Sequence, residues 1–186
     1  MSAPTDPYAD RCLVDDATHR SLALCRAIIS NPTTDPGTRI SCLAKCTSHL
    51  DSLPRVRAFD VQAPRDIRQS QKAPSTTDNA KSLPSSASTW TPGLMQILLD
   101  RALAFKDLAA AYLRSGDAQN SAFNFDRTVT LLESLTLAIP LFSIQNKGGT
   151  ESLIASALLQ ALGGWADVEQ SLGRNAKAAK IRMRAD

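Results

Sequence analysis

The sequence predicts an all-α protein, a helical bundle of antiparallel hairpins with a disordered Pro/Ser-rich linker. Two observations support this fold class. Apolar residues recur at helical spacing through most of the chain, whereas strict alternation of apolar and polar residues over the length of a strand does not occur. The pairs Asp35-Pro36 and Thr91-Pro92 each combine a helix N-cap with a proline at the first helical position.

Residues 1–53 are expected to form an N-terminal helical hairpin. A helical apolar pattern runs from Tyr8 to Ser30 and stops at Asn31-Pro32, which predicts the first helix. Asp35 is the expected cap of the second helix. The second helix has one apolar stripe, made of Ile40, Leu43, Ala44, Thr47 and Leu50.

Residues 54–91 are expected to form a flexible linker. Prolines recur at positions 54, 64, 74, 84 and 92, and the intervening residues are rich in Ser, Thr, Asn and Gln. This composition offers too little apolar surface to offset the entropy of ordering the chain. A short helix around Asp60–Gln71 stays open as an alternative, and Ser75–Thr91 is expected to have no regular structure.

Residues 92–186 are predicted to form the main helical bundle. Its first helix follows Thr91-Pro92 and ends at Ser115-Gly116, where glycine can supply the left-handed residue past a helix end. Asp117 is the expected cap of the second helix, which continues to Ile139 before Pro140.

Two further helices are expected at the C-terminus. We predict a turn at 146–149, a long helix from its cap at Thr150 to Leu172-Gly173, and a last helix from Asn175. Gly163 and Gly164 weaken the long helix, which indicates that another backbone approaches it closely there.

The composition is typical of a globular protein. With 43% hydrophobic and 21% charged residues, the 186-residue chain resembles an ordinary globular protein, and its net charge of +3 is too small to drive nucleic-acid binding. We find no secretory signal and no apolar run of the roughly 20 residues that a membrane span needs. We therefore expect an intracellular protein, cytoplasmic or nuclear, whose four cysteines are thiols.

Two chemical sites are considered and not favoured. Cys42, Cys46 and His49 share one helix face, and Cys25 could complete four zinc ligands, although the spacing is not that of a zinc finger. Such cysteines are more often small core residues, so metal binding stays open and no cofactor is predicted. A Cys–His catalytic pair would lack a nucleophile turn and a third orienting group. We therefore do not expect an enzyme.

The second half of the chain resembles a known helical repeat. The residues that carry the resemblance are Phe105, Leu108, Ala109, Tyr112, Gly116, Phe125 and Thr128. They fall at the spacings of a tetratricopeptide repeat, a pair of antiparallel helices. A second match consists of Leu162, Trp165, Ala166, Gly173, Ala178 and Ala185. The resemblance implies helical hairpins that hold a peptide or helix in a groove.

The chain departs from that family in its spacing. Gly116 and Gly173 are 57 residues apart where the repeat period is 34, so an insertion is expected around Leu137–Thr150. The same helices after a linker also resemble microtubule-interacting-and-trafficking domains. Both resemblances imply docking of a peptide or helix, and neither implies catalysis.

Two sets of residues are candidates for partner binding. By the resemblance, Leu103, Lys106, Ala110 and Leu113 would line the inner groove, and an apolar groove of this kind suits an amphipathic helix. Packing against the next helix is the competing interpretation. The second set lies in the basic C-terminal helix. It consists of Lys177, Lys180 and Arg184, beside Arg174 and Arg182, with only Asp186 opposing them.

These candidates lead to two functional hypotheses. The first is a non-catalytic protein-interaction module, an adaptor, scaffold or regulatory subunit that binds a peptide or amphipathic helix between its helices. The alternative is an RNA or nucleic-acid-binding protein that uses the basic C-terminal helix, whose charge the helix macrodipole alone would also explain. Homo-oligomerisation stays open under both hypotheses.

Overall fold

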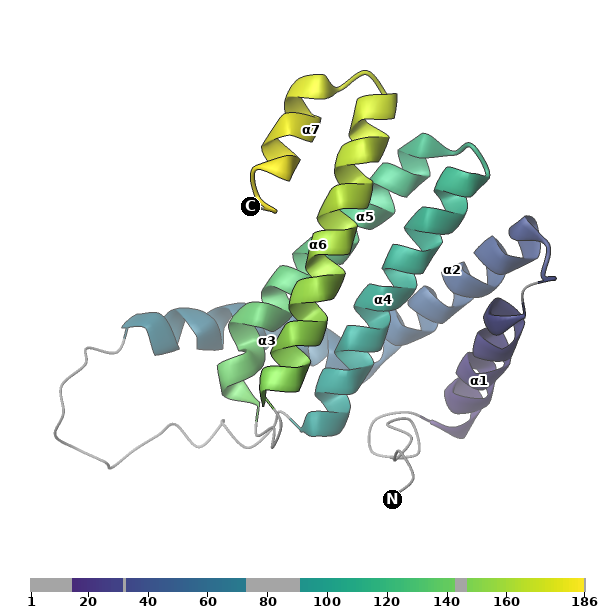
Figure 1. Cartoon of the computed structure of the whole chain (residues 1–186). Coiled ribbons are helices and arrows are strands. Elements are labelled where there is room, and N and C mark those ends of the chain that lie inside the picture. The colour runs from purple at the N-terminus through teal and green to yellow at the C-terminus, as the bar shows by residue number, and fades with distance from the viewer. Residues whose placement is uncertain (1–14, 32, 73–90, 143–146, 186) are drawn as a thin grey trace, which may run out of the picture.

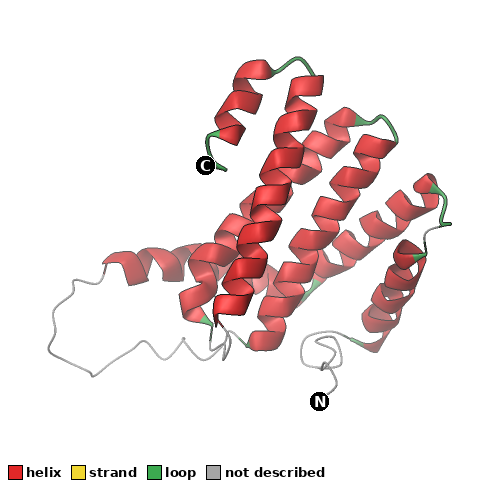
Figure 2. Ribbon diagram, viewed as in Figure 1, coloured by secondary structure: helices red, strands yellow, loops and turns green. Residues whose placement is uncertain are grey.

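The structure is a computed structural model that describes residues 15–31, 33–72, 91–142 and 147–185. Within these residues the chain is helical and has no strand, which confirms the all-α fold class (Figure 2). The elements in order are α1 (Asp16–Ser30), α2 (Pro36–Ser52), α3 (Pro54–Lys72), α4 (Pro92–Arg114), α5 (Ala118–Ala138), the short 3-10 helix η2 (Ile139–Leu141), α6 (Lys147–Ser171) and α7 (Asn175–Arg182).

Three helix starts, those of α2, α4 and α5, are the ones that the capping residues predict. The side chains of Asp35, Thr91 and Asp117 accept backbone hydrogen bonds from the residue three positions ahead, at 2.8, 3.2 and 3.0 Å. The predicted cap at Thr150 is wrong, because α6 already begins at Lys147 and Thr150 lies inside it. The glycines of the predicted turn did not prevent helix formation at 147–149.

Three antiparallel hairpins make up the body of the protein. They are α1/α2, α4/α5 and α6/α7, and α2 packs on α4 while α5 packs on α6. Figure 1 shows α4 and α6 in front of α5, with α1 at one edge of the array, α7 at the other, and α3 crossing its lower end. Gly116 and Gly173, with φ of +84° and +75°, form the two tight turns that the sequence predicts after α4 and α6.

The sequence leaves open whether the N-terminal hairpin packs on the C-terminal bundle. One core cluster contains Leu22 of α1, Leu50 of α2, Leu98 of α4 and Trp165 of α6. In the described part of the chain, α1 and α2 therefore share one hydrophobic core with the helices of the bundle.

The expected linker at 54–91 is wrong for its first half. Residues 54–72 form α3, and Val56, Phe59 and Ala63 on this helix are almost completely buried. Phe59 also packs against Phe142, with ring centroids 5.9 Å apart. The average composition of 54–91 hid this local stripe, whose i, i+3, i+7 spacing is typical of a helix that buries one face. Residues 73–90 lie outside the described part of the chain.

Among the described helices, none combines the length and the apolar character that a membrane span needs.

Candidate functional site

The predicted inner strip lies on α4, where its members have different surroundings. Leu103 and Ala110 are half-buried, and Leu103 packs against the core. Lys106 Nζ donates a hydrogen bond to Gln160 Oε1 of α6, 3.1 Å away. Leu113 is 41% exposed. Lys106 thus lies toward α6, whereas Leu103 lines a small pocket beside α1 and α2, so the four residues do not form one continuous strip and packing accounts for part of it.

The basic C-terminal residues are brought together, but they are paired inside the protein. Lys177 Nζ and Arg174 Nη1 contact the carboxylate of Glu169 at 2.7 and 3.2 Å. Arg182 pairs with Asp167, and Arg184 pairs with Glu133 of α5. The expectation that only Asp186 opposes these cations is therefore wrong. Spacing along one helix did not reveal carboxylates that come from α5 and α6.

Lys180 differs from its neighbours in this cluster. It is exposed, and no carboxylate pairs with it among the residues that the structure describes. The four other cations also stay about half-exposed, but their charges are balanced nearby. A field strong enough to hold a polyanion needs unbalanced charge, so this helix offers less of it than its sequence indicates.

Glu169 is the buried centre of the C-terminal cluster. Its side chain is only 1% exposed, and it also accepts a hydrogen bond from the indole Nε1 of Trp165 at 3.0 Å. Lys177 lies 5.0 Å from the centroid of the Trp165 ring. Burial by itself would raise the carboxyl pKa of Glu169. The hydrogen bonds from Lys177, Trp165 and Arg174 outweigh that effect and hold the pKa below its ordinary value of 4.5.

Glu169 should therefore give stability that is lost in acid. A carboxyl group whose pKa is lowered on folding stabilises the protein above its unfolded-state pKa, and this contribution disappears as pH falls through the folded-state value. We expect Glu169→Gln to lower the free energy of unfolding by about 1.5 kcal/mol at pH 7 through its charged hydrogen bonds. The difference from the wild type should shrink as pH falls below about 4.5. Urea unfolding followed by circular dichroism measures it.

The exposed carboxylate of Asp167 serves as the control for this experiment. Its side chain is 73% exposed and pairs only with Arg182 at the surface. We expect Asp167→Asn to change stability by less than about 0.5 kcal/mol at any pH, because exposed ion pairs contribute little. A Glu169→Gln effect that stays constant from pH 7 to pH 3 would contradict the assignment.

The cysteines of the possible zinc site lie in the core. Cys25, Cys42 and Cys46 are buried and free, and His49 Nε2 lies 2.9 Å from Ser21 Oγ. Burial raises the pKa of the Cys46 thiol to about 11, so it stays protonated and unreactive at neutral pH. Within the described residues, no three side chains of His, Cys, Asp or Glu are grouped so that they could hold a metal ion. Cys12 lies outside the described residues.

A hollow lies elsewhere in the described part of the chain, between α3 and α5, with α4 as its floor. It is an open groove of about 520 Å³, within the range of roughly 300–1,000 Å³ typical of ligand sites. We refer to it as the α3–α5 groove. Its lining consists of Phe59, Asp60, Ala63 and Pro64 of α3, Leu98 and Arg101 of α4, and Arg127, Thr130, Leu131, Ser134, Leu135 and Leu137 of α5.

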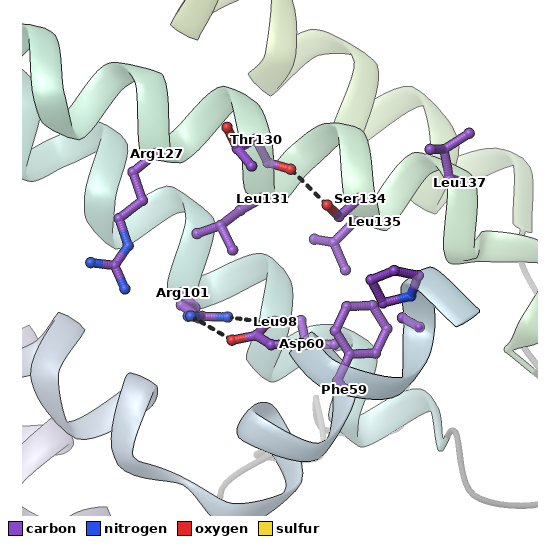
Figure 3. A pocket seen from close by; sticks show the side chains of 12 residues that line it. Phe59, Asp60, Leu98, Arg101, Arg127, Thr130, Leu131, Ser134, Leu135 and Leu137 are labelled. Atoms are coloured by element: carbon purple, nitrogen blue, oxygen red, sulfur yellow. Dashed lines mark hydrogen bonds and ion pairs between the residues drawn. The ribbon is translucent and has the colours of Figure 1, made fainter. Parts of the chain in front are cut away.

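The groove has one polar end and one apolar end. Figure 3 shows Arg127 and the Arg101–Asp60 pair at one end of the lining and Leu137 at the other. Leu137 is 54% exposed although it is a large apolar residue. The groove therefore places exposed apolar surface next to fixed charges, which is the combination that orients a bound molecule.

A network of four charged residues builds the polar end. Arg101 is buried, and its Nη1 and Nη2 donate to the two carboxylate oxygens of Asp60 at 2.9 and 3.0 Å. Its Nε donates to Asp51 Oδ1 at 2.6 Å, and the other oxygen of Asp51 accepts from Arg127. The network joins the end of α2 to α3, α4 and α5. It fixes the two walls of the groove relative to its floor.

The two arginines of the network differ in their surroundings. Burial disfavours the charge of Arg101, but Asp60 and Asp51 outweigh this and raise the pKa of its guanidinium, so it stays charged. Arg127 is more exposed and lies over the Phe105 ring, 4.3 Å from the ring centroid. Arg101 thus has a structural role. Arg127 is the arginine of this network that a molecule bound in the groove can contact.

Sequence reasoning missed this groove because it assigned one wall to a linker. Asp51, Asp60, Arg101 and Arg127 are separated by up to 76 residues, and no local motif joins them. One signal was present. Arg101 falls within the apolar pattern of α4, and an arginine at a core-facing position needs a buried partner.

Comparison of the chain with protein-family models, curated proteins and solved structures finds no match.

Proposed function

We propose that the protein is a non-catalytic interaction module that holds an amphipathic helix of a partner protein in the α3–α5 groove. The observation that supports this most directly is an open groove with apolar walls and a preformed polar end. Leu137 and Leu131 offer apolar surface there, and burying such surface contributes roughly 25 cal/mol per Å² to binding. We propose this groove as the binding site in place of the α4 strip that the sequence suggests.

The chemistry of the groove also favours binding over catalysis. Its carboxylates, Asp51 and Asp60, are both engaged by arginines, so neither is poised as a general base. The hydroxyl groups of Thr130 and Ser134 donate to backbone carbonyls one turn earlier. No base activates them among the described residues, so they serve as polar contacts.

The arrangement of hairpins supports a repeat-like reading of the fold. Lys106 and Gln160, which hydrogen-bond to each other, lie at inner positions of the two units that resemble tetratricopeptide repeats. The α1/α2 hairpin packs on α4 and adds a third helical pair. We propose that three hairpins form a short stack of this kind, with α3 inserted between the first and second.

Two exposed leucines decide which surface binds. Leu137 lies in the groove and Leu113 on the α4 strip, and both are substantially exposed, so either should tolerate Glu without unfolding. We expect Leu137→Glu to weaken capture of the partner at least tenfold, since roughly 1.4 kcal/mol corresponds to a factor of ten. Leu113→Glu should change it less than twofold. Affinity purification from the cells that express the chain, with quantitative mass spectrometry, measures both.

Leu159→Glu on α6 is the matched control, at 52% exposure and outside the groove. Equal recovery of every protein by the wild type and Leu137→Glu would contradict the proposed site. Loss through Leu113→Glu alone would move the site to the α4 strip. Recovery of nucleic acid that depends on Lys180 would instead favour the alternative function.

A further inference from the structure

We infer that the helix held in the α3–α5 groove is acidic, with carboxylates beside its apolar face. This inference rests on the proposed function and specifies the chemistry of the partner. It follows from which groups at the polar end are already paired and which retain unused hydrogen-bond donors.

The apolar part of the groove fixes one face of the partner. Pro64 of α3 and Leu131, Leu135 and Leu137 of α5 line it, and the two helices form opposite walls. A helix that lies between two helical walls can insert side chains of one stripe, spaced three and four residues apart. The partner therefore needs an apolar stripe. The groove is not suited to the uniformly charged backbone of a nucleic acid.

The polar end has spare donors on Arg127. Only Nη2 of this guanidinium is engaged by a carboxylate, that of Asp51, among the described residues. A guanidinium carries five N–H donors, so most of them are available. Stacking on Phe105 and the bond to Asp51 hold the group in place. A cation fixed in this way binds a carboxylate without the entropy cost of ordering a free side chain.

The charges around the groove favour the same partner. Arg101 and Arg127 are balanced by Asp60 and Asp51. Arg55 and Arg57 of α3 are exposed and have no carboxylate partner in the described part of the chain, and Arg57 Nε donates to the backbone oxygen of Asp51.

Asp126 of α5, next to Arg127 in the sequence, is an exposed carboxylate. Its single negative charge is smaller than the combined positive charge of Arg55 and Arg57 on the other wall helix. The exposed charges of Arg55 and Arg57 attract acidic segments over a range of about 10 Å at 0.1 M salt.

A displayed peptide library tests the inference directly. Peptides with a fixed apolar helical stripe and random polar positions are selected on the full chain, with the Leu137→Glu variant as the counter-target. The selected peptides should contain more Asp and Glu than the input library. They should bind the wild type at least tenfold more tightly than Leu137→Glu in fluorescence polarisation.

The selected peptide then tests the role of Arg127. We expect Arg127→Gln to weaken its binding about tenfold and Lys45→Gln, the same charge change on the exposed surface of α2, to change it less than twofold. A peptide whose acidic residues are replaced by Gln should not distinguish Arg127→Gln from the wild type. Should Arg127→Gln fail to fold by circular dichroism, Asp126→Asn replaces it and should strengthen binding about twofold.

The outcomes separate the two proposals. Peptides that depend on Leu137 but show no acidic excess, or show a basic one, would overturn the acidic partner and leave the groove as a docking site. Peptides that bind Leu137→Glu as tightly as the wild type would overturn the proposed function itself. A fluorescent oligouridine RNA should not displace the peptide at 150 mM salt, and displacement would also overturn the inference.

Discussion

Replacing Arg101 with methionine should lower the free energy of unfolding by about 3 kcal/mol, as expected when one partner of a buried ion pair is removed. The arginine side chain is 5% exposed and holds Asp51 and Asp60 at the junction of four helices. Without it, Asp60 loses its cation and Asp51 keeps only its pair with Arg127. Both are partly exposed, which places the effect at the lower end of the known range. Urea unfolding by circular dichroism measures the change.

A triple variant shows whether charge is the cause. Arg101→Met combined with Asp51→Asn and Asp60→Asn removes both carboxylates that Arg101 had paired, so most of the lost stability should return. Failure of the triple variant to recover would mean that the packing of the Arg101 side chain, and not its charge, holds the helices together. Arg127→Met alone should cost less, because that residue is more exposed.

Phe125→Ala should lower the free energy of unfolding by about 3–5 kcal/mol by leaving a cavity in the core. The ring is 5% exposed and sits between α5 and α6, where it touches Gly164. A Cβ atom at Gly164 would lie 2.6 Å from Phe125 Cζ. Gly164→Ala should therefore cost about 1–3 kcal/mol through overpacking, despite the better helix propensity of alanine. Thermal or chemical unfolding compares the variants.

Gly163→Ala provides the matched control in the same helix. No atom lies within 4 Å of a Cβ built at Gly163, so this change should be neutral or stabilising by up to about 1 kcal/mol. The double variant Phe125→Ala/Gly164→Ala should lose less than the sum of the single variants, since the added methyl group enters the cavity. Additive losses would contradict this contact.

The Gly163-Gly164 pair also shows how far the sequence could predict packing. The expectation of a close approach at these glycines was right in part, because Gly164 does lie against another helix. The approaching group is an aromatic ring and not a backbone, and Gly163 has open space beside it. Local propensity indicates where a helix is weak. It does not indicate which of two adjacent glycines turns toward its neighbour.

Helix boundaries were predictable where a side chain could cap the helix. Asp35, Asp117 and Thr91 act through bonds that reach only three residues ahead, so the information is local. The start of α6 was missed because Thr150 resembles a cap while the helix begins earlier. Helix α3 was foreseen only as an alternative, a short helix around Asp60–Gln71, because its buried stripe of Val56, Phe59 and Ala63 gains stability only from the helices it contacts.

The candidate site was the least predictable part. Lys177 and Arg184 looked like free cations in the sequence, but their partners, Glu169 and Glu133, are on other helices. The groove depends on residues from α3, α4 and α5 that become neighbours only after folding. The charges of one helix in the sequence therefore do not predict the electrostatic potential at the surface of the folded protein.

The core shared by all three hairpins has a consequence for how the protein loses its structure. Because residues as distant as Leu22 and Ile181 belong to the same buried cluster, the hairpins are not independent units. When one hairpin unfolds, apolar side chains of the next hairpin become exposed to water. Unfolding is therefore expected to be cooperative across the described hairpins. A partner that clamps α3 against α5 would then protect amide hydrogens from exchange in helices it never touches.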